Sequence, residues 1–283
     1  MNKLKVVILG SSGQLGNSLI LYLIKKKINC FSITHKTKKF LNSKYLYDHV
    51  CTKNNNFERI KKKIKKFNPT HMINCFSIEK DKMQNKKILN EVYISLTKKY
   101  IDFANKNKIT FINIGTDIVF DGKKGLYKEA DKPNPFTLYG KYKLKAEKKF
   151  KNILTLRMSI ISFNPIKKNG FINWVISKKY RINGFRNYYF SGISSLEASR
   201  LIFKILLSRK KILGVFNLSG KRINKLELIK IICKIYRIKR KVVAYEEPKI
   251  DLSLIGDKLK NIYKFKINNI ESQMIAIKNF YDK

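Results

Sequence analysis

Residues 4–16, LKVVILGSSGQLG, constrain the fold of this chain more than any other stretch. The apolar run LKVVIL stops at Gly10, and further glycines follow at Gly13 and Gly16. A buried strand that ends in glycines at this spacing is typical of the strand–turn–helix unit that opens a dinucleotide-binding fold. Gly10 allows the tight turn, Gly13 lets the backbone approach a pyrophosphate, and Gly16 lets the helix pack closely on the strand. The alternative is a plain glycine turn before a helix, but the register at the end of an apolar strand favours the nucleotide site.

Strands and helices are expected to alternate through the first half of the chain. The expected strands are residues 29–34, 45–50, 70–75 and 109–115, and the ILTLR segment that ends at Arg157. The expected helices are residues 15–27, 57–67, 86–106 and 138–149. Later come a helix at 171–179, a Gly- and aromatic-rich stretch to residue 189, a helix from 195, the strand GVFNLSG and a helix from 225.

This alternation predicts an α/β fold with a Rossmann-type, doubly wound parallel sheet and a smaller C-terminal α/β substrate domain. We expect residues 1–158 to form the NAD(P)-binding domain, completed by a strand and a helix from about 195–222. The remainder of residues 159–283 is expected to form the substrate domain. Ligands should bind between the two, outside the carboxyl ends of the strands.

The charge balance is extreme, with 62 Lys and Arg against 19 Asp and Glu among 283 residues. Nucleic acid is the obvious partner to consider. The lysines, however, are spread over the whole length among Ile, Asn, Tyr and Phe, and no nucleic-acid motif accompanies them. We therefore expect no specific nucleic-acid partner, although the charge favours polyphosphate ligands by steering.

A reduced, cytoplasmic protein is expected from the remaining composition. The chain passes from MNKLKVVI directly into the first strand without a signal peptide, and no apolar run approaches the roughly 20 residues of a membrane span. The cysteines Cys30, Cys51, Cys75 and Cys233 are far apart, with neither metal-ligand spacing nor a disulfide framework. The sequence leaves the oligomeric state open, and a homodimer is one arrangement to consider.

The end of the second strand bears on the choice of cofactor. In this fold an acidic residue there binds the ribose hydroxyls of NAD, whereas a basic residue accommodates the 2′-phosphate of NADP. The chain has THKTKK at this point, with Lys36 and no carboxylate. NADP(H) is therefore preferred and NAD(H) remains possible, since a lysine at this position can also be coincidental in so basic a chain.

Three side chains have the chemistry of a ketone reductase. Tyr139 and Lys143 lie four residues apart on one helix, hence on one face, and Thr116 follows the fifth strand. Hydride delivery to a ketone creates negative charge on oxygen, which requires a proton donor. A nearby ammonium lowers the pKa of a tyrosine from its usual value of about 10, and a threonine can donate a further hydrogen bond. The alternative reading is a half-buried helix aromatic beside a solvated surface lysine.

The chain resembles the extended short-chain dehydrogenase/reductases, most closely the dTDP-4-dehydrorhamnose reductase family. The motifs GSSGQLG, GTDIVFDG, YKEADKPNPFTLYGKYKLKAE, LRMSII, FSGISSLEAS and IDLSLIGDKL occur in the family's order, over nearly the whole chain. The resemblance implies Tyr139 as proton donor, Lys143 on the nicotinamide ribose, and Thr116 with Asp117 at the substrate carbonyl. It also implies cofactor contacts from Gln14 and Leu15 to the pyrophosphate, from Asp48 and His49 near the adenine, and from Cys75, Phe76 and Ser77.

The sequence departs from the family pattern at several positions. Gly115 stands where the family usually has Ser, Cys75 and Phe76 replace alanine-like residues, and Leu252 stands where many relatives have the Arg of a DRSL motif. The magnesium of some members has no matching acidic residues, so no metal is expected. Ile118 stands where a related 4,6-dehydratase has an acid, and the substrate half contains no histidine for an epimerase.

The function implied by the resemblance is NAD(P)H-dependent reduction of the 4-keto group of a nucleotide-activated deoxysugar, for surface polysaccharide biosynthesis. The alternative is a non-catalytic, NADP-binding regulatory subunit of the same fold.

Overall fold

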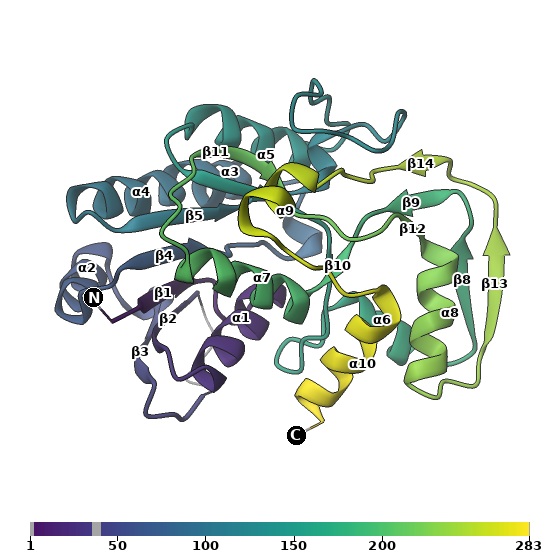
Figure 1. The fold of residues 1–283 in the computed structure, drawn as a ribbon, viewed down its shortest axis with the longest axis horizontal. Coiled ribbons are helices and arrows are strands. Elements are labelled where there is room, and N and C mark those ends of the chain that lie inside the picture. Colours follow the sequence, from purple (N-terminus) through teal and green to yellow (C-terminus); the bar gives the residue numbers. More distant parts are fainter. Residues whose placement is uncertain (1–2, 36–40, 283) are drawn as a thin grey trace.

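A parallel sheet forms the centre of the computed structural model, which describes residues 3–35 and 41–282 (Figure 1). Within those ranges seven strands pair in the order β11-β6-β5-β4-β1-β2-β3, and every pair is parallel. The strands are β1 (Lys5–Leu9), β2 (Asn29–Thr34), β3 (Leu46–Cys51), β4 (His71–Asn74), β5 (Thr110–Ile114), β6 (Leu154–Arg157) and β11 (Gly214–Asn217). The predicted doubly wound fold class is confirmed.

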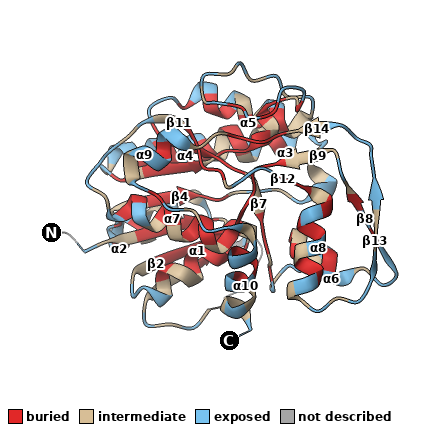
Figure 2. Cartoon of the chain, turned by 45° about the vertical axis from the view of Figure 1, so that its right-hand side comes forward, coloured by how far each residue is buried: buried red, intermediate tan, exposed pale blue. Residues whose placement is uncertain are grey.

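Helices cover both faces of this sheet. One face packs against α1 (Gln14–Lys25), α7 (Ser195–Leu207) and α9 (Asp257–Tyr263), and the other against α2 (Phe57–Phe67), α4 (Thr97–Lys106) and α5 (Leu138–Lys149). Successive residues of β1 alternate between the two cores, with Val6 and Ile8 in the first and Val7 and Leu9 in the second. The sheet is therefore buried on both sides, as its red interior shows (Figure 2).

The helix expected at residues 86–106 is interrupted. It consists of α3 (Lys86–Asn90), a π-helical segment η3 (Glu91–Leu96) and α4. The Thr97 hydroxyl donates to the Val92 carbonyl at 2.9 Å and accepts a bond from the Asn74 amide at 3.2 Å. Single π turns in helices are frequent at functional sites, and this one carries Tyr93 against Tyr139, with ring centroids 5.7 Å apart.

The second half of the chain forms a smaller body around its own core (Figure 1). Its helices are α6 (Phe171–Ser177), α8 (Lys225–Ile235) and α10 (Ile270–Tyr281). Its strands are β7 (Ile160–Ile161), β8 (Arg181–Phe185), β9 (Tyr188–Phe190), β10 (Ile193–Ser194), β12 (Ile223–Asn224), β13 (Lys241–Tyr245) and β14 (Ile250–Asp251). The smaller α/β part expected from the sequence is present, although most of these strands are too short to show a period in the sequence.

Three elements from the later sequence, β11, α7 and α9, lie with the first half. Strand β11 pairs with β6, and α7 packs beside α1, where the Ser18 and Ser195 hydroxyls are 2.6 Å apart. Helix α10 reaches the same place, since the Tyr281 hydroxyl lies 2.7 Å from that of Ser18. The division at residue 158, with the nucleotide-binding part completed by residues from about 195–222, remains a prediction.

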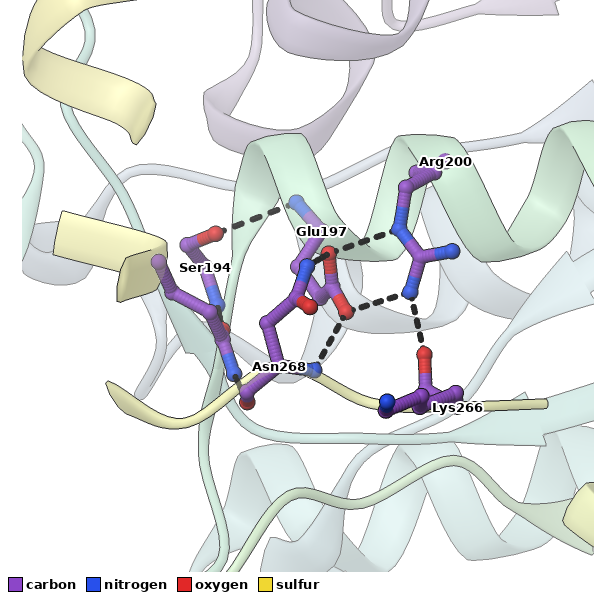
Figure 3. A network of polar contacts seen from close by, with 6 residues as sticks. Ser194, Glu197, Arg200, Lys266 and Asn268 are labelled. Atoms are coloured by element: carbon purple, nitrogen blue, oxygen red, sulfur yellow. Dashed lines mark hydrogen bonds and ion pairs between the residues drawn. The ribbon is translucent and has the colours of Figure 1, made fainter. Parts of the chain in front are cut away.

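A polar network fixes the segment before α10 to helix α7 (Figure 3). Arg200 donates two hydrogen bonds to the Glu197 carboxylate, at 2.9 and 2.6 Å, and a third to the Lys266 carbonyl at 2.6 Å. The Asn268 backbone and amide donate to the same carboxylate. Burial alone would raise the pKa of Glu197, but the bonds from Arg200 and Asn268 hold it below its usual value.

Among the described residues no helix is long and apolar enough to cross a membrane.

Candidate active site

The glycine turn after β1 has no room for side chains. Gly10 has φ +78°, and a Cβ there would lie 2.8 Å from the Cys75 carbonyl oxygen. A Cβ on Gly16 would lie 2.3 Å from the Gly10 carbonyl oxygen. Gly13 is the N-cap of α1 and provides no side-chain acceptor, so the first-turn N–H groups, including those of Gln14 and Leu15, have no partner within the helix. This cradle fits the pyrophosphate of a dinucleotide.

The side chain of Gln14 binds the second half of the chain. Its amide nitrogen donates to the Asn169 carbonyl at 2.7 Å, and its amide oxygen accepts from the Ser162 hydroxyl at 2.8 Å. Nearby, the Asn164 amide donates to the Ser12 carbonyl at 3.1 Å. The Gln14 side chain thus fixes residues 162–169 against the glycine turn. Its backbone N–H and the second N–H of its amide group remain for the predicted pyrophosphate contact. The Leu15 side chain is buried in the core.

The segment after β4 lies against the same turn. The Cys75 N–H donates to the Leu9 carbonyl at 2.9 Å, and the Ser77 hydroxyl lies 3.5 Å from the position of a Cβ on Gly13. The Phe76 ring packs against Tyr100 in the helix layer, 5.8 Å between centroids. Cys75 and Ser77 therefore lie against the glycine turn. The backbone nitrogen of Phe76 lies there as well, whereas its ring packs in the helix layer.

The two residues predicted near the adenine have different surroundings. His49 on β3 bonds the Ser32 hydroxyl at 2.8 Å, and Ser32 bonds Ser11 of the glycine turn at 2.6 Å. Asp48 forms an ion pair with Lys63 of α2 at 2.8 Å. His49 is therefore linked to the glycine turn through Ser32. The Asp48 carboxylate instead pairs with α2. Lys36 lies outside the described residues.

The three predicted catalytic residues meet at the carboxyl end of β5. Thr116 follows that strand, and its hydroxyl is a hydrogen-bond partner of the Tyr139 phenol. Tyr139 stands in the first turn of α5, which approaches residue 118 so closely that a Cβ on Gly140 would lie 2.3 Å from the Ile118 carbonyl oxygen. The Lys143 ammonium donates to the Ile114 carbonyl at 2.5 Å. These three residues, which are separated in the sequence, therefore form one cluster in space.

Burial dominates the electrostatics of this cluster. It raises the pKa of Tyr139 well above its usual range. It lowers the pKa of Lys143 to about 8, against the opposing influence of Glu147 and Cys75. The Lys143 ammonium also lies 4.8 Å from the centroid of the Tyr93 ring. Near neutral pH Lys143 is therefore mostly an ammonium.

A buried ion pair stands behind Lys143. Glu147, one turn further along α5, accepts bonds of 3.0 and 2.8 Å from Arg157 at the end of β6, both on the same carboxylate oxygen. Its other oxygen faces Gly115, where a Cβ would lie 3.0 Å away. The Ser that the family usually has at this position would crowd Glu147 and Arg157 here, which gives a packing reason for Gly115.

Asp117 is buried beside Thr116, whose hydroxyl donates to its carboxylate at 3.2 Å. Burial raises the pKa of Asp117, while Lys225, Ser159 and Thr116 lower it. Burial also raises the pKa of Tyr188 to about 12, with a further contribution from the Asp117 charge.

Sequence reasoning missed four residues of this site, namely Tyr93, Ser159, Tyr188 and Lys225. Tyr93 depends on the π turn, which leaves no clear pattern in the sequence. Ser159 sits in LRMSII, a motif that already resembled the family, and could have been found there. Lys225 and Tyr188 come from the second half, where no strand–helix period predicted their position.

Leu252 has no polar role. It is 1% exposed and packs with Val119, Phe120, Tyr127 and Leu254. The neighbouring Asp251 pairs with Arg222 at 2.8 Å. At position 252 this chain therefore lacks the positive charge that many relatives carry there.

A basic cavity of about 850 Å³ lies at the opposite edge of the sheet. It is lined by residues at the amino ends of the strands, including Lys5, His71 and Thr110. Open parallel sheets bind their ligands outside the carboxyl ends of the strands. None of the predicted site residues lines this cavity, and we place the active site at the glycine turn and β5.

This fold and this site define an NAD(P)-dependent oxidoreductase of the short-chain dehydrogenase/reductase class. More narrowly, the chain belongs to the RmlD substrate binding domain family, whose model matches residues 4–185. The resemblance found in the sequence is thereby confirmed. No curated protein has a sequence that matches this chain.

Solved structures of similar fold include reductases and an epimerase. A hypothetical dTDP-4-dehydrorhamnose reductase from Sulfolobus tokodaii is 24% identical, with 94% of this chain and 97% of that chain covered and a TM-score of 0.77. The dTDP-4-dehydrorhamnose reductase from Bacillus anthracis, solved in complex with NADP, is 18% identical, with coverages of 99% and 100% and a TM-score of 0.77. A UDP-glucose 4-epimerase is 12% identical, with coverages of 98% and 97% and a TM-score of 0.81. At these identities the likeness establishes the fold, and the reaction must be argued from the site.

Proposed function

We propose that this protein reduces the 4-keto group of a nucleotide-activated 6-deoxyhexose with NADPH. The observation that carries the proposal is the cluster of Thr116, Tyr139 and Lys143 at the carboxyl end of β5, close to the glycine turn. Family membership and the similarity to dTDP-4-dehydrorhamnose reductases support a sugar nucleotide as substrate. Ile118, where a related dehydratase has an acid, supports simple reduction.

The nicotinamide cofactor supplies the hydride when it is bound. When substrate binds, the Thr116 hydroxyl turns its single proton from the Asp117 carboxylate to the oxygen of the substrate carbonyl, where negative charge develops. Tyr139 gives the proton from its hydroxyl to that oxygen. Lys143, held by the Ile114 carbonyl, stabilises the resulting phenolate with its charge. The aromatic ring of Tyr93 against Tyr139 and Lys143 excludes water from one side of the pair.

Three finer statements belong to the same proposal. NADPH is preferred over NADH because Lys36 follows the second strand without a carboxylate nearby in sequence. The enzyme is cytoplasmic, and its product enters a surface polysaccharide. A homodimer is the oligomeric form to test first.

The test is oxidation of NADPH, followed by its near-ultraviolet absorbance, in the presence of dTDP- or UDP-linked 4-keto-6-deoxyhexoses. Turnover with one of these substrates supports the proposal. Tight NADPH binding without oxidation across the panel, measured on folded protein, would instead favour the non-catalytic regulatory subunit.

A further inference from the structure

Tyr93, in the π turn η3, differs from the other buried side chains of its helix layer. Ile94 of the same turn and Tyr100 of α4 pack in the apolar core between that layer and the sheet. Tyr93 is also buried, at 2% exposed, but its ring contacts groups of the active site. Burial raises the pKa of Tyr93 far above its usual range, so the phenol stays neutral. The ring is therefore an uncharged aromatic surface within the site.

The Lys143 ammonium lies over that ring. Its nitrogen is 4.8 Å from the ring centroid, within the range in which an aromatic face attracts a cation. The ammonium also donates to the Ile114 carbonyl at 2.5 Å. Glu147, one turn further along α5, is already paired with Arg157. Lys143 is therefore held by two uncharged groups, a carbonyl and a ring, which attract its positive charge without neutralising it.

Two further contacts fix the ring itself. It meets the Tyr139 ring edge-on, with centroids 5.7 Å apart and ring planes at 71°. Its hydroxyl accepts a hydrogen bond of 3.3 Å from the Ile78 N–H. Ile78 follows Cys75 and Ser77, which lie against the glycine turn. Tyr93 thus contacts both predicted catalytic residues of α5 and the segment that is expected beside the cofactor.

The π turn that carries Tyr93 is anchored to the sheet. The Thr97 hydroxyl donates to the Val92 carbonyl and accepts a bond from the Asn74 amide at the end of β4. The same amide donates to the Asn113 side chain on β5 at 3.0 Å. The carboxyl ends of two central strands therefore hold this turn, and with it the Tyr93 ring, next to the site.

We propose that Tyr93 is a positioning residue of the reductase, whose ring holds the Lys143 ammonium one helix turn from Tyr139 and favours its charged form. This inference rests on the proposed function for the reaction that it serves. A positioning role differs from plain packing in one respect. The contact between ring and ammonium stabilises the protein only while Lys143 is charged, whereas plain packing does not depend on pH.

The size of the effect follows from the contact. An aromatic face favours a desolvated ammonium over the neutral amine by about 2- to 30-fold. Loss of the ring should therefore lower the pKa of Lys143 from about 8 by about 0.4 to 1.5 pH units. Glu147 on the same helix and Cys75 after β4 act on the same ammonium and stay unchanged. The resulting loss of stability should be complete at about pH 6 and absent above about pH 9, where Lys143 is neutral with or without the ring.

Urea denaturation at a series of pH values measures this effect without turnover. Tyr93→Leu removes the ring, and Tyr93→Phe keeps the ring and removes only the hydroxyl. Tyr100→Leu is the matched control, because Tyr100 is a buried tyrosine of the same helix layer whose hydroxyl has no partner in the described part of the chain. The unfolding constant of Tyr93→Leu relative to the wild type should be about 2- to 30-fold larger at about pH 6 than at about pH 9. For the other two variants this ratio should not change with pH.

The kinetics of the same variants show whether the contact serves the reaction. The assay is NADPH oxidation with a dTDP-4-keto-6-deoxyhexose. In Tyr93→Leu the alkaline limb of the kcat profile should move to lower pH by about 0.4 to 1.5 pH units. In Tyr93→Phe and Tyr100→Leu the limb should stay in place, because both keep the ring over Lys143.

Three results would overturn the inference. They are a stability ratio for Tyr93→Leu that does not change with pH, an equal pH dependence in Tyr93→Phe or Tyr100→Leu, and an unmoved kcat limb in Tyr93→Leu. Near-ultraviolet circular dichroism checks the fold, and Tyr93→Met takes the place of Tyr93→Leu if the latter does not fold. Failure of the proposed function has a different signature: the stability ratio changes with pH as expected, and the wild type oxidises no NADPH.

Discussion

Substitution of Lys143 by methionine should stabilise the protein near neutral pH while it abolishes most of the reductase activity. Lys143 is 6% exposed, and burial lowers the pKa of its ammonium from 10.5 to about 8. Each pKa unit corresponds to about 1.4 kcal/mol between the two protonation states, so the charged form costs the folded state about 3 kcal/mol. The bond to Ile114 returns about 1 kcal/mol. Methionine of similar length should therefore gain about 2 kcal/mol in the free energy of unfolding at about pH 7.

The gain should disappear as the pH rises. The folded pKa of Lys143 lies below its unfolded value, so between about pH 8 and 10.5 the unfolded chain binds more protons than the folded protein. In that window the stability of the wild type rises with pH through this group, and below it the full penalty applies. The methionine variant lacks this contribution. The difference between the two proteins should thus shrink by about 2 to 3 kcal/mol from about pH 7 to pH 10.

Urea denaturation of the two proteins at a series of pH values measures this difference, because the many other lysines cancel in the subtraction. Lys141→Met, at an exposed lysine of the same helix, corrects for the general loss of one positive charge. A stability difference between Lys143→Met and the wild type that does not change with pH would refute the reasoning. So would a variant less stable than the wild type at every pH.

Three further predictions concern the cofactor and the proton donor. Tyr139→Phe should lower kcat by about 10² to 10⁴, the usual contribution of a positioned general acid, with NADPH affinity nearly unchanged; full turnover in a folded variant would contradict the role. Gly16→Ala places a Cβ 2.3 Å from the Gly10 carbonyl oxygen, so NADPH affinity measured by fluorescence titration should fall at least about tenfold, and wild-type affinity would show that the turn can move without loss. Lys36→Asp should reverse or erase the preference for NADPH over NADH in steady-state kinetics, and equal use of both cofactors by the wild type would make Lys36 coincidental.

Local patterns in the sequence predicted much of the first half. The bounds of β2, α2 and α5 coincide with those expected at residues 29–34, 57–67 and 138–149, because each has an apolar period and clear ends. Asn56 caps α2 and Thr137 caps α5 through their side chains. The glycine turn and the helix that carries Tyr139 and Lys143 could be predicted from the sequence for the same reason.

The rest depends on contacts between distant segments. The π turn at residues 91–96 extends a helical pattern and leaves the period nearly unchanged, so the sequence predicts one continuous helix there. The polar partners of Asp48 and Gln14 lie on α2 and in residues 162–169. Lys225 looks like one lysine among many until the fold brings three aromatic rings around it.

The late entry of β11 into the sheet has a consequence for synthesis of the protein. Residues 214–217 pair with β6 at residues 154–157, and 56 residues, α7 among them, lie between the two strands. At roughly 5 to 20 residues per second, the ribosome needs about 3 to 11 seconds to make that intervening stretch. During this time β6, paired with β5 on one side, leaves its other edge unpaired, the kind of surface that promotes association between nascent chains. We therefore expect the yield of folded enzyme to depend on chaperones and on growth temperature more than its final stability would suggest.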